Sequence, residues 1–457
     1  MPEPTTRYDR SVLILHPRAP RALLLPSGDA WALPCVAGDN PDLAEVGPLD
    51  AAVRERWGID AVVLRCAYAD CAVTPEPWVD TVFVMAPRDD RPTLPPGARW
   101  VDPVALADLR LAHPAHGPVI ATCLAELETG AIPPQRMPWA RRGWFAQAEH
   151  WIAEGLAEAG RAPATHVAEV KNWSSSCVLR AETADGPVFF KALPPLLAQT
   201  PALTQDLAHS YPDLVRPPLA CRMDPPWMLS PDFGGTPLGE TDFQHWEETV
   251  RRLARIQIGC AGHVDHLLAL GCPDQRLARI RAAIRPLLDD GPALERLSAD
   301  EIARLRGAAP RWEAICDELA TYHIPPTLVH SDLHVANVLV RGDGTILFDW
   351  ALASITHPFF DLEPLFVTGA AQLDAVPDGV RRLRAVYLAA WTDYESRERL
   401  DAAFALAARI GALYLAILFQ RLIGGLERGA RWELAGSVAF WLHRLLDLDA
   451  GRAAEVQ

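Results

Sequence analysis

A chain of 457 residues is too long for a single hydrophobic core, and its length predicts two or three domains. The formal net charge is −15, with Asp and Glu spread along the whole sequence. This charge argues against nucleic acid or an anionic membrane as a partner, and it suits a neutral or cationic small molecule. The nine cysteines include no C-x-x-C pair, which predicts a reducing, cytoplasmic location rather than a disulfide framework.

No basic segment followed by an apolar run is present near residue 1, so we expect no secretory signal. The longest apolar stretch, residues 410–419, is flanked by Arg409 and Arg421. A membrane span needs roughly 20 apolar residues, so this stretch predicts a buried helix.

Along residues 10–127, strand-like runs such as SVLILH and DTVFVMAP alternate with turns and two helical segments. This pattern predicts a compact α/β domain over residues 1–130. Residues 131–143 are rich in Pro and Arg without a clear period, which predicts a linker. Residues 144–457 then form a second region that has short strands up to about residue 191 and becomes mainly helical after about residue 232.

One interruption of the helical pattern alternates like a β-hairpin around a turn at residues 341–344. Its strands would be Val338–Val340 and Thr345–Phe348, folded back antiparallel. Asn337 and Asp349 then become neighbours at the open end of the hairpin. An amide oxygen and a carboxylate are ligands that Mg²⁺ prefers when it is shared with phosphates.

Asp332 lies five residues before Asn337, where its carboxylate could accept the proton of a hydroxyl. The pattern H-x-D-x₄-N followed by Asp349 resembles the catalytic loop and metal aspartate of the kinase superfamily. The motif HSDLHVAN at residues 330–337 and the later motif THPFFDL at residues 356–362 resemble those of the aminoglycoside/choline phosphotransferase branch. The resemblance implies that Asp332 is the catalytic base and that Asn337 and Asp349 hold Mg²⁺. It also implies that His330 braces the loop and that Asp361 is structural. The alternative is a polar β-turn that happens to carry three acceptors.

The same resemblance places a nucleotide-binding lobe at residues 144–232 and a catalytic lobe at 233–457. Lys191 ends the strand-like run VFFKA, where such a kinase has its phosphate-binding lysine. Only two lysines, Lys171 and Lys191, occur among the 43 basic residues. The segment KNWSSSC, which begins at Lys171, stands where the phosphate-covering loop is expected. It lacks glycine, so its nucleotide contacts would come from Ser174, Ser175 and Ser176, and Lys171 is either a phosphate contact or simply exposed.

Two features depart from the kinase pattern. Residues 194–212 contain no glutamate to pair with Lys191, so Thr200, Gln205 or Asp206 would have to orient it. The sequence Asp-Phe-Gly at residues 232–234 precedes the catalytic loop by about a hundred residues, and we interpret it as the hinge between lobes.

A possible zinc ligand set is spread over one predicted helix and its end. These residues are Cys260, His263, His266 and Cys272. We expect them to take part in helix packing rather than to bind a metal ion.

WALPCVAGD at residues 31–39, followed by the helix DAAVRERWGID, resembles the entry and helix of a Nudix domain. Such a domain uses several glutamates to hold the metals that hydrolyse nucleoside diphosphate linkages. Here Glu55 is the one glutamate in register, because Ala52 and Arg56 occupy two other ligand positions. The resemblance therefore implies a Nudix-like fold without hydrolase activity, and the alternative is another small α/β domain.

Together these features predict an α/β and α+β multidomain protein, with a Nudix-like domain followed by a protein-kinase-like bilobal phosphotransferase. The expected function is ATP- and Mg²⁺-dependent transfer of the γ-phosphoryl group to a hydroxyl of a small molecule. One rival is a silent nucleotide-binding or regulatory module, which the missing glutamate favours and the intact Asp332, Asn337 and Asp349 oppose. The other is a nucleotide hydrolase acting through residues 1–130, which the depleted glutamates oppose.

Overall fold

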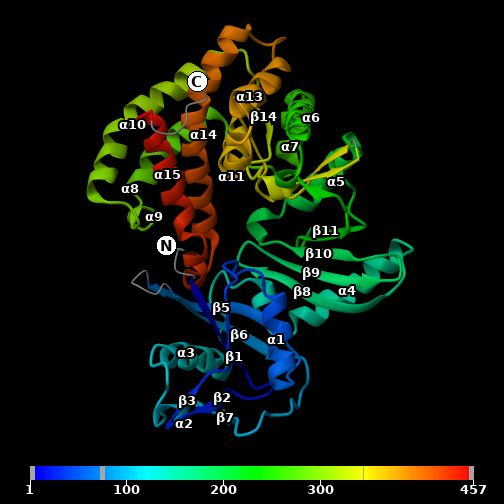
Figure 1. Cartoon of the computed structure of the whole chain (residues 1–457), viewed down its shortest axis with the longest axis vertical. Helices are drawn as coiled ribbons and strands as arrows, with labels where there is room; N and C mark the ends of the chain where they lie inside the picture. The colour runs from blue at the N-terminus through cyan, green and yellow to red at the C-terminus, as the bar shows by residue number, and fades with distance from the viewer. Residues whose placement is uncertain (1–5, 73–77, 343, 452–457) are drawn as a thin grey trace. The chain divides into compact units, whose positions relative to one another are not determined.

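A computed structural model describes residues 6–72, 78–342 and 344–451, and the chain forms two compact units (Figure 1). The first unit contains Met1–Pro194 and Gly425–Glu433, and the second contains Pro195–Gly424 and Leu434–Gln457. The chain therefore passes from one unit to the other three times.

The first unit contains a mixed sheet of strand order β4-β1-β6-β5, in which β1 and β6 run parallel. Its strands are β1 (Arg7–Ile14), β4 (Cys35–Gly38), β5 (Ala61–Ala72) and β6 (Trp78–Pro87). Both faces are covered, because α1 (Gly47–Trp57) packs with one set of alternate residues and α3 (His116–Thr129) with the other (Figure 1). Val12 and Phe83 face the α1 side, whereas Leu13 and Val82 face the α3 side. Burial on both faces explains why these strands are continuously apolar instead of alternating.

A second, smaller sheet lies beside this core and has the order β3-β2-β7. Its elements, with the short helix that follows, are β2 (Ala22–Ser27), β3 (Ala30–Ala32), β7 (Arg99–Val101) and α2 (Pro103–Ala107). The strand-like runs recognised in the sequence over residues 10–127 are therefore strands, and the predicted α/β composition of this region is confirmed.

The first unit continues beyond residue 130. Within residues 131–143 the structure has η1 (Pro138–Ala140), with Arg136 and Trp139 buried. The unit then adds α4 (Trp144–Glu158) and three antiparallel strands, β8 (Ala164–Trp173), β9 (Ser176–Thr183) and β10 (Val188–Ala192). Its last element is η7 (Arg428–Glu433), which returns from the C-terminal part of the chain.

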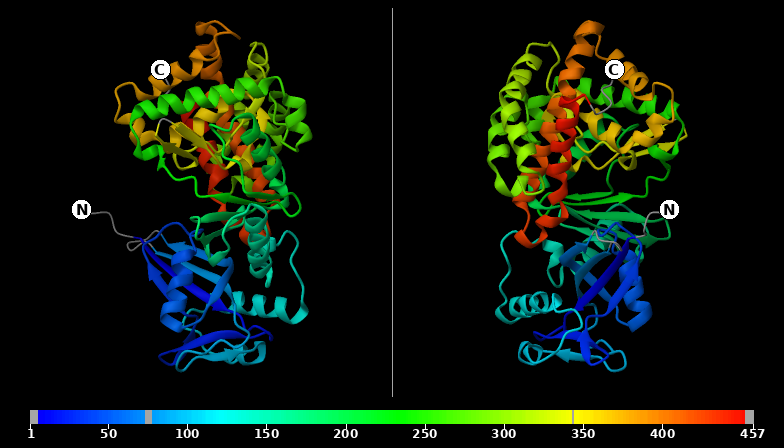
Figure 2. Two further views of the ribbon diagram at one scale, coloured as in Figure 1. Left: turned by 90° about the vertical axis from the view of Figure 1, so that its right-hand side faces the viewer. Right: turned by 60° about the vertical axis from the view of Figure 1, so that its left-hand side comes forward.

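The second unit is mainly helical. Its α-helices are α5 (Thr200–Ser210), α6 (Phe243–Ala261), α7 (Val264–Ala269), α8 (Leu277–Asp289), α9 (Gly291–Leu294), α10 (Ala299–Leu319), α11 (Leu362–Thr368), α12 (Ala370–Asp374), α13 (Gly379–Ala389), α14 (Arg397–Gly425) and α15 (Ala435–Asp449). Its short 3₁₀ helices are η2 (Pro195–Leu197), η3 (Leu238–Glu240), η4 (Val335–Asn337), η5 (Trp350–Leu352) and η6 (Pro358–Asp361). Helices α8 and α10 pack against each other as a pair (Figure 2).

Short strands interrupt these helices at three places. They are the pair β11 (Ala220–Arg222) and β12 (Trp227–Pro231), the sheet β13 (Thr236–Pro237), β15 (Val338–Arg341) and β16 (Gly344–Leu347), and the pair β14 (Thr327–Val329) and β17 (Ser354–Thr356).

Helix α14 contains the apolar stretch noted in the sequence. Within the described ranges it is the one helix long and apolar enough to cross a membrane by length and composition, and 67% of its apolar window is buried inside the protein. Every residue from Ile410 to Leu418 is buried. The prediction of a buried helix is therefore confirmed.

Candidate active site

The predicted hairpin is present in the second unit. Strands β15 and β16 pair antiparallel, with Val338 opposite Leu347, and the Phe348 N–H donates to the Asn337 carbonyl at 3.2 Å. Of the expected turn residues, Asp343 lies outside the described part of the chain, and Gly342 has φ 57°. Closure of the hairpin brings Asn337 and the residue after Phe348, Asp349, to its open end. Asp349 itself adopts the left-handed conformation with φ 64°, which Asp tolerates better than most residues.

Asp332 is joined to Asn337 by hydrogen bonds. The Asn337 side-chain amide donates to the Asp332 main-chain oxygen at 2.9 Å and to its carboxylate at 3.2 Å. The Asp332 side chain is 35% exposed, and the ring Nε2 of His334 lies 3.8 Å from its carboxylate. The carboxylate is thus both oriented by Asn337 and open to a hydroxyl from outside.

His330 is completely buried beneath this loop. Its ring Nε2 lies 2.9 Å from the Phe348 carbonyl oxygen, to which it donates, and the ring stacks obliquely on Trp350. Burial lowers the pKa of His330 to about 4, so the imidazole is neutral near pH 7. These contacts place His330 between the loop that carries Asp332 and the strand that leads to Asp349.

Asp361 supports the same loop from below. Its fully buried carboxylate accepts the main-chain N–H groups of His330 at 2.9 Å and Ser331 at 2.8 Å. It also accepts from the side-chain amide of Gln257 on α6 at 2.9 Å. Burial raises the pKa of Asp361 to about 7, and the three donors oppose that rise.

Two tyrosines complete this buried network. The Tyr387 hydroxyl donates to the Gln257 side-chain oxygen at 2.5 Å. The Tyr414 hydroxyl lies 2.6 Å from the Ser331 hydroxyl and 2.7 Å from that of Ser354 on β17. The second unit therefore fixes the catalytic loop through side chains of α6, α13 and α14.

The supporting residues that the sequence did not predict are Gln257, Tyr387 and Tyr414. A signal was present for Gln257, because it occupies a position on the apolar stripe of α6 that includes Leu253 and Cys260. An amide on a buried helix face needs a partner, and that need points to a polar contact in the core. Nothing local in the sequence indicates that the partner is Asp361.

The family resemblance implies Mg²⁺ at Asn337 and Asp349, and the donor set fits that ion. The amide nitrogen of Asn337 donates to Asp332, so the amide oxygen is the atom of this side chain that could bind a cation. One amide oxygen and one carboxylate match a Mg²⁺ that retains water and shares phosphate oxygens. Over the described residues, no group of three His, Cys, Asp or Glu side chains is arranged to hold a metal ion by protein ligands alone.

The predicted nucleotide residues all lie in the first unit. Lys191 is on β10, where it pairs with Val178 of β9, and its side chain is partly buried. The serine-rich segment is the β8–β9 connection, with Ser174 and Ser175 as a two-residue turn and Trp173 opposite Ser176.

Two of these residues have partners within the first unit. Ser174 is buried, and its N–H donates to the Glu433 carboxylate at 2.8 Å. The Lys171 ammonium lies 3.1 Å from the Asp42 carboxylate and is half exposed.

The residues considered as partners of Lys191 have local contacts in the second unit. The Thr200 hydroxyl donates to the Leu197 carbonyl, and the Asp206 carboxylate lies 2.8 Å from the His266 ring. Asp232, in the expected hinge, is exposed and accepts the Gly234 N–H at 2.9 Å. His266 is thus engaged with Asp206 rather than with the cysteines of the zinc alternative.

Comparison with known proteins gives one family match. Residues 191–402 match the model of a family described as a phosphotransferase enzyme family. No curated protein matches the chain in sequence. The matched segment begins at Lys191 and spans the whole catalytic loop.

Several solved structures are similar over about two thirds of this chain. The macrolide 2′-phosphotransferase of Brachybacterium faecium is 18% identical, with a TM-score of 0.44 and coverage of 64% of this chain and 98% of that one. The ethanolamine kinase of Plasmodium vivax is 10% identical, with a TM-score of 0.46 and coverage of 63% and 84%. The choline kinase of Cryptosporidium parvum is 12% identical, with a TM-score of 0.44 and coverage of 63% and 91%.

The family match coincides with the loop in which Asn337 orients Asp332. The resemblance to a phosphotransferase enzyme family therefore includes the segment that contains Asp332, Asn337 and Asp349.

Proposed function

We propose that this protein is a small-molecule kinase that uses ATP as donor and transfers its γ-phosphoryl group to a hydroxyl of an aminoglycoside-like molecule, an amino alcohol or a sugar. The observation that carries the proposal is the Asn337 amide nitrogen, which holds the Asp332 carboxylate on the hairpin whose open end leads to Asp349. The net charge of −15 supports a neutral or cationic acceptor.

In the proposed reaction the acceptor hydroxyl oxygen forms a bond to the γ-phosphorus, and the bond from that phosphorus to the β–γ bridging oxygen breaks. ADP leaves, and the hydroxyl proton passes to the Asp332 carboxylate. His330 and Asp361 keep that carboxylate in position. Asn337 and Asp349 would hold Mg²⁺, which supplies positive charge against the β- and γ-phosphate oxygens. Lys191 would contact the α- and β-phosphates, and Ser174, Ser175, Ser176 and Lys171 are the further nucleotide contacts we propose.

The test replaces Asp349 by Asn, which keeps the side-chain volume and removes the charge. Steady-state ATP consumption should be screened against a panel of hydroxyl metabolites and antibiotics with Mg²⁺. We expect kcat to fall about 100-fold or more, because a charged ligand at the phosphates is lost.

Asp232→Asn is the matched control, since it alters an exposed aspartate in the same unit that lies outside the catalytic loop. Because Asp232 lies in the expected hinge, its replacement should act as a hinge or stability defect and leave the dependence of turnover on Mg²⁺ unchanged. Full activity in Asp349→Asn, or a metal-dependent loss in Asp232→Asn alone, would overturn the assignment. Nucleotide binding by the wild type without any turnover would favour the silent regulatory module.

We also propose that residues 1–130 are a Nudix-like scaffold without hydrolase activity, joined through residues 131–143 to the kinase region at 144–457, in a cytoplasmic protein. Glu55 is exposed on α1 between Arg54 and Arg56. Arg54 pairs with the carboxylates of Asp50 and Asp60. A lone glutamate beside two cations is a poor divalent-cation site, which supports the absence of hydrolysis.

A further inference from the structure

The tip of the serine-rich segment is fixed by a carboxylate. Ser174 is 8% exposed, and its N–H donates to Glu433 of η7 at 2.8 Å. On the other side of the turn, the Trp139 indole N–H donates to the Trp173 carbonyl at 3.0 Å. A turn between two strands that is held at both its N–H and its carbonyl has little freedom to move.

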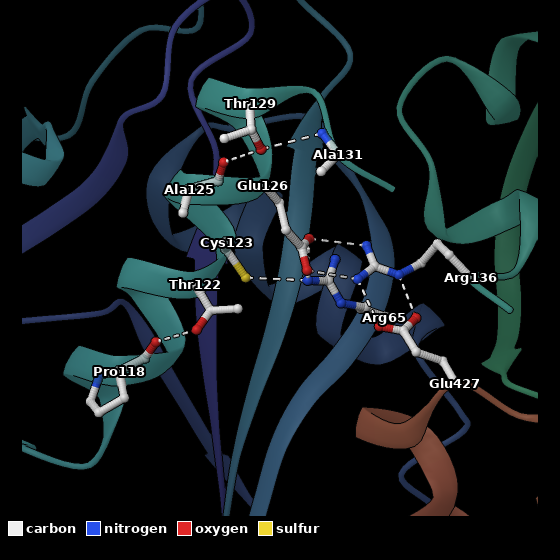
Figure 3. A network of polar contacts seen from close by, with 10 residues as sticks. All are labelled: Arg65, Pro118, Thr122, Cys123, Ala125, Glu126, Thr129, Ala131, Arg136 and Glu427. Atoms are coloured by element: carbon white, nitrogen blue, oxygen red, sulfur yellow. Dashed lines mark hydrogen bonds and ion pairs between the residues drawn. The ribbon is translucent and has the colours of Figure 1, made fainter. Parts of the chain in front are cut away.

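Glu427, which precedes Glu433 in the same segment, belongs to an ion-pair network (Figure 3). The Arg136 guanidinium donates to Glu427 at 2.8 Å and to both carboxylate oxygens of Glu126, at 2.9 Å and 3.1 Å. Arg65 of β5 donates to the same Glu126 at 3.1 Å. Arg136 itself is 7% exposed. Segment 425–433 is therefore anchored to α3 and β5 of the N-terminal α/β region.

Strand β8, which leads into the turn, is fixed by the same region. Strand β5 is an edge strand of its sheet, so main-chain groups on its outer side can bond to other elements. The Val63 N–H donates to the buried Glu169 carboxylate at 2.7 Å, and its carbonyl accepts from the Asn172 amide at 2.7 Å. The Asn172 N–H donates to Ala44 at 2.9 Å. The side chains of Glu169 and Asn172 thus make the hydrogen bonds to Val63 that a neighbouring strand would otherwise make.

We infer that Glu433 is a positioning residue for the nucleotide because it fixes the serine turn, and that the N-terminal α/β region supports this turn through segment 425–433 and through Val63. This inference rests on the proposed nucleotide role of Ser174, Ser175 and Ser176. According to this inference, residues 1–130 support nucleotide binding structurally and catalyse no reaction themselves.

The physical benefit is preorganisation. A phosphate-binding loop that contains glycine is mobile and must lose conformational entropy when the nucleotide binds. Here the turn is ordered before binding, because the Ser174 N–H is already occupied by Glu433. Ser175 and Ser176, which are only partly buried, keep their side chains at the outer part of the turn. Loss of the Glu433 contact should thus weaken nucleotide binding and leave acceptor binding unchanged.

The experiment compares Glu433→Ala with Glu433→Gln in the full-length protein. The glutamine retains an oxygen that accepts the Ser174 N–H, whereas alanine removes the acceptor. We expect Glu433→Ala to raise KM for ATP about tenfold, with KM for the acceptor within about twofold of wild type. Glu433→Gln should restore KM for ATP to within about threefold of wild type. Glu154→Ala, on the exposed face of α4, is the control in the same unit and should match wild type.

Hydrogen exchange supplies a readout independent of turnover. The Ser174 amide should be protected in the wild type without nucleotide and should lose that protection in Glu433→Ala. If protection is lost and KM for ATP is unchanged, or if Gln and Ala shift that KM equally, the inference is overturned while the proposed function stands. If the wild type neither binds nor consumes ATP, the proposed function fails and this inference fails with it.

Discussion

The residue with the most demanding conformation in the candidate site is Ser331, whose φ is 67°. A left-handed non-glycine residue costs about 1 kcal/mol or more, so neighbours must hold it there. Asp361 does so by accepting two consecutive N–H groups, those of His330 and Ser331. Because Asp332 follows Ser331 directly, the backbone conformation of Ser331 sets the orientation of the Asp332 side chain.

Asp361→Asn tests that dependence. The amide has one accepting oxygen where the carboxylate has two, so a buried donor loses its acceptor. We expect kcat to fall at least about tenfold and the free energy of unfolding to drop by about 2 kcal/mol. Steady-state kinetics and urea unfolding would measure the two effects. An unchanged kcat in a folded Asp361→Asn protein would show that the loop keeps its geometry without this carboxylate.

At the scale of elements, the hairpin was predictable and its supports were not. Period-two alternation around a glycine-containing turn is a local signal, and antiparallel closure then places Asn337 beside Asp349. The contacts of Gln257 and Tyr414 come from α6 and α14, which are distant in sequence from the loop. Their apolar periodicity indicates a buried face but does not identify what that face packs against.

Tyr414→Phe is the test at this scale, because it removes only the hydroxyl that joins Ser331 to Ser354. Two serine hydroxyls lose a partner, at about 1 kcal/mol each. We expect kcat to fall about three- to tenfold, with KM for ATP unchanged. Tyr387→Phe, whose hydroxyl contacts Gln257 one step further from the loop, should lower kcat less. The reverse order of the two variants would argue against α14 as the support of the catalytic loop.

For the chain as a whole, the sequence predicted the α/β and helical regions and a linker at residues 131–143. It gave no sign that Arg136 within that linker pairs with Glu427, 291 residues later. Ion pairs over such separations leave no periodic or local trace in one sequence. The assignment of functions to residues 1–130 and 144–457 stays a prediction.

The buried Glu169 predicts a pH dependence of the first unit. Burial raises its pKa to about 8, so between about pH 4.5 and pH 8 the folded protein holds a proton that the unfolded chain has released. Stability therefore falls as pH rises through this window, by up to about 1.4 kcal/mol per pH unit from this group. Glu169→Gln keeps an acceptor for Val63 and does not titrate. Its Tm should fall less than that of the wild type between pH 6.5 and pH 8, and an identical decline would contradict the assignment.

The return of residues 425–433 to the first unit imposes an order on synthesis. When the ribosome has made the first 194 residues, Arg136 and the Ser174 amide still lack Glu427 and Glu433, which follow 291 and 259 residues later. The nascent first unit therefore carries an incompletely paired arginine and an uncapped turn throughout translation of α5 to α14. The serine turn reaches its final form only after the polypeptide has been extended past residue 433, so a chain that ends before this residue has a first unit in which the Ser174 N–H lacks its acceptor.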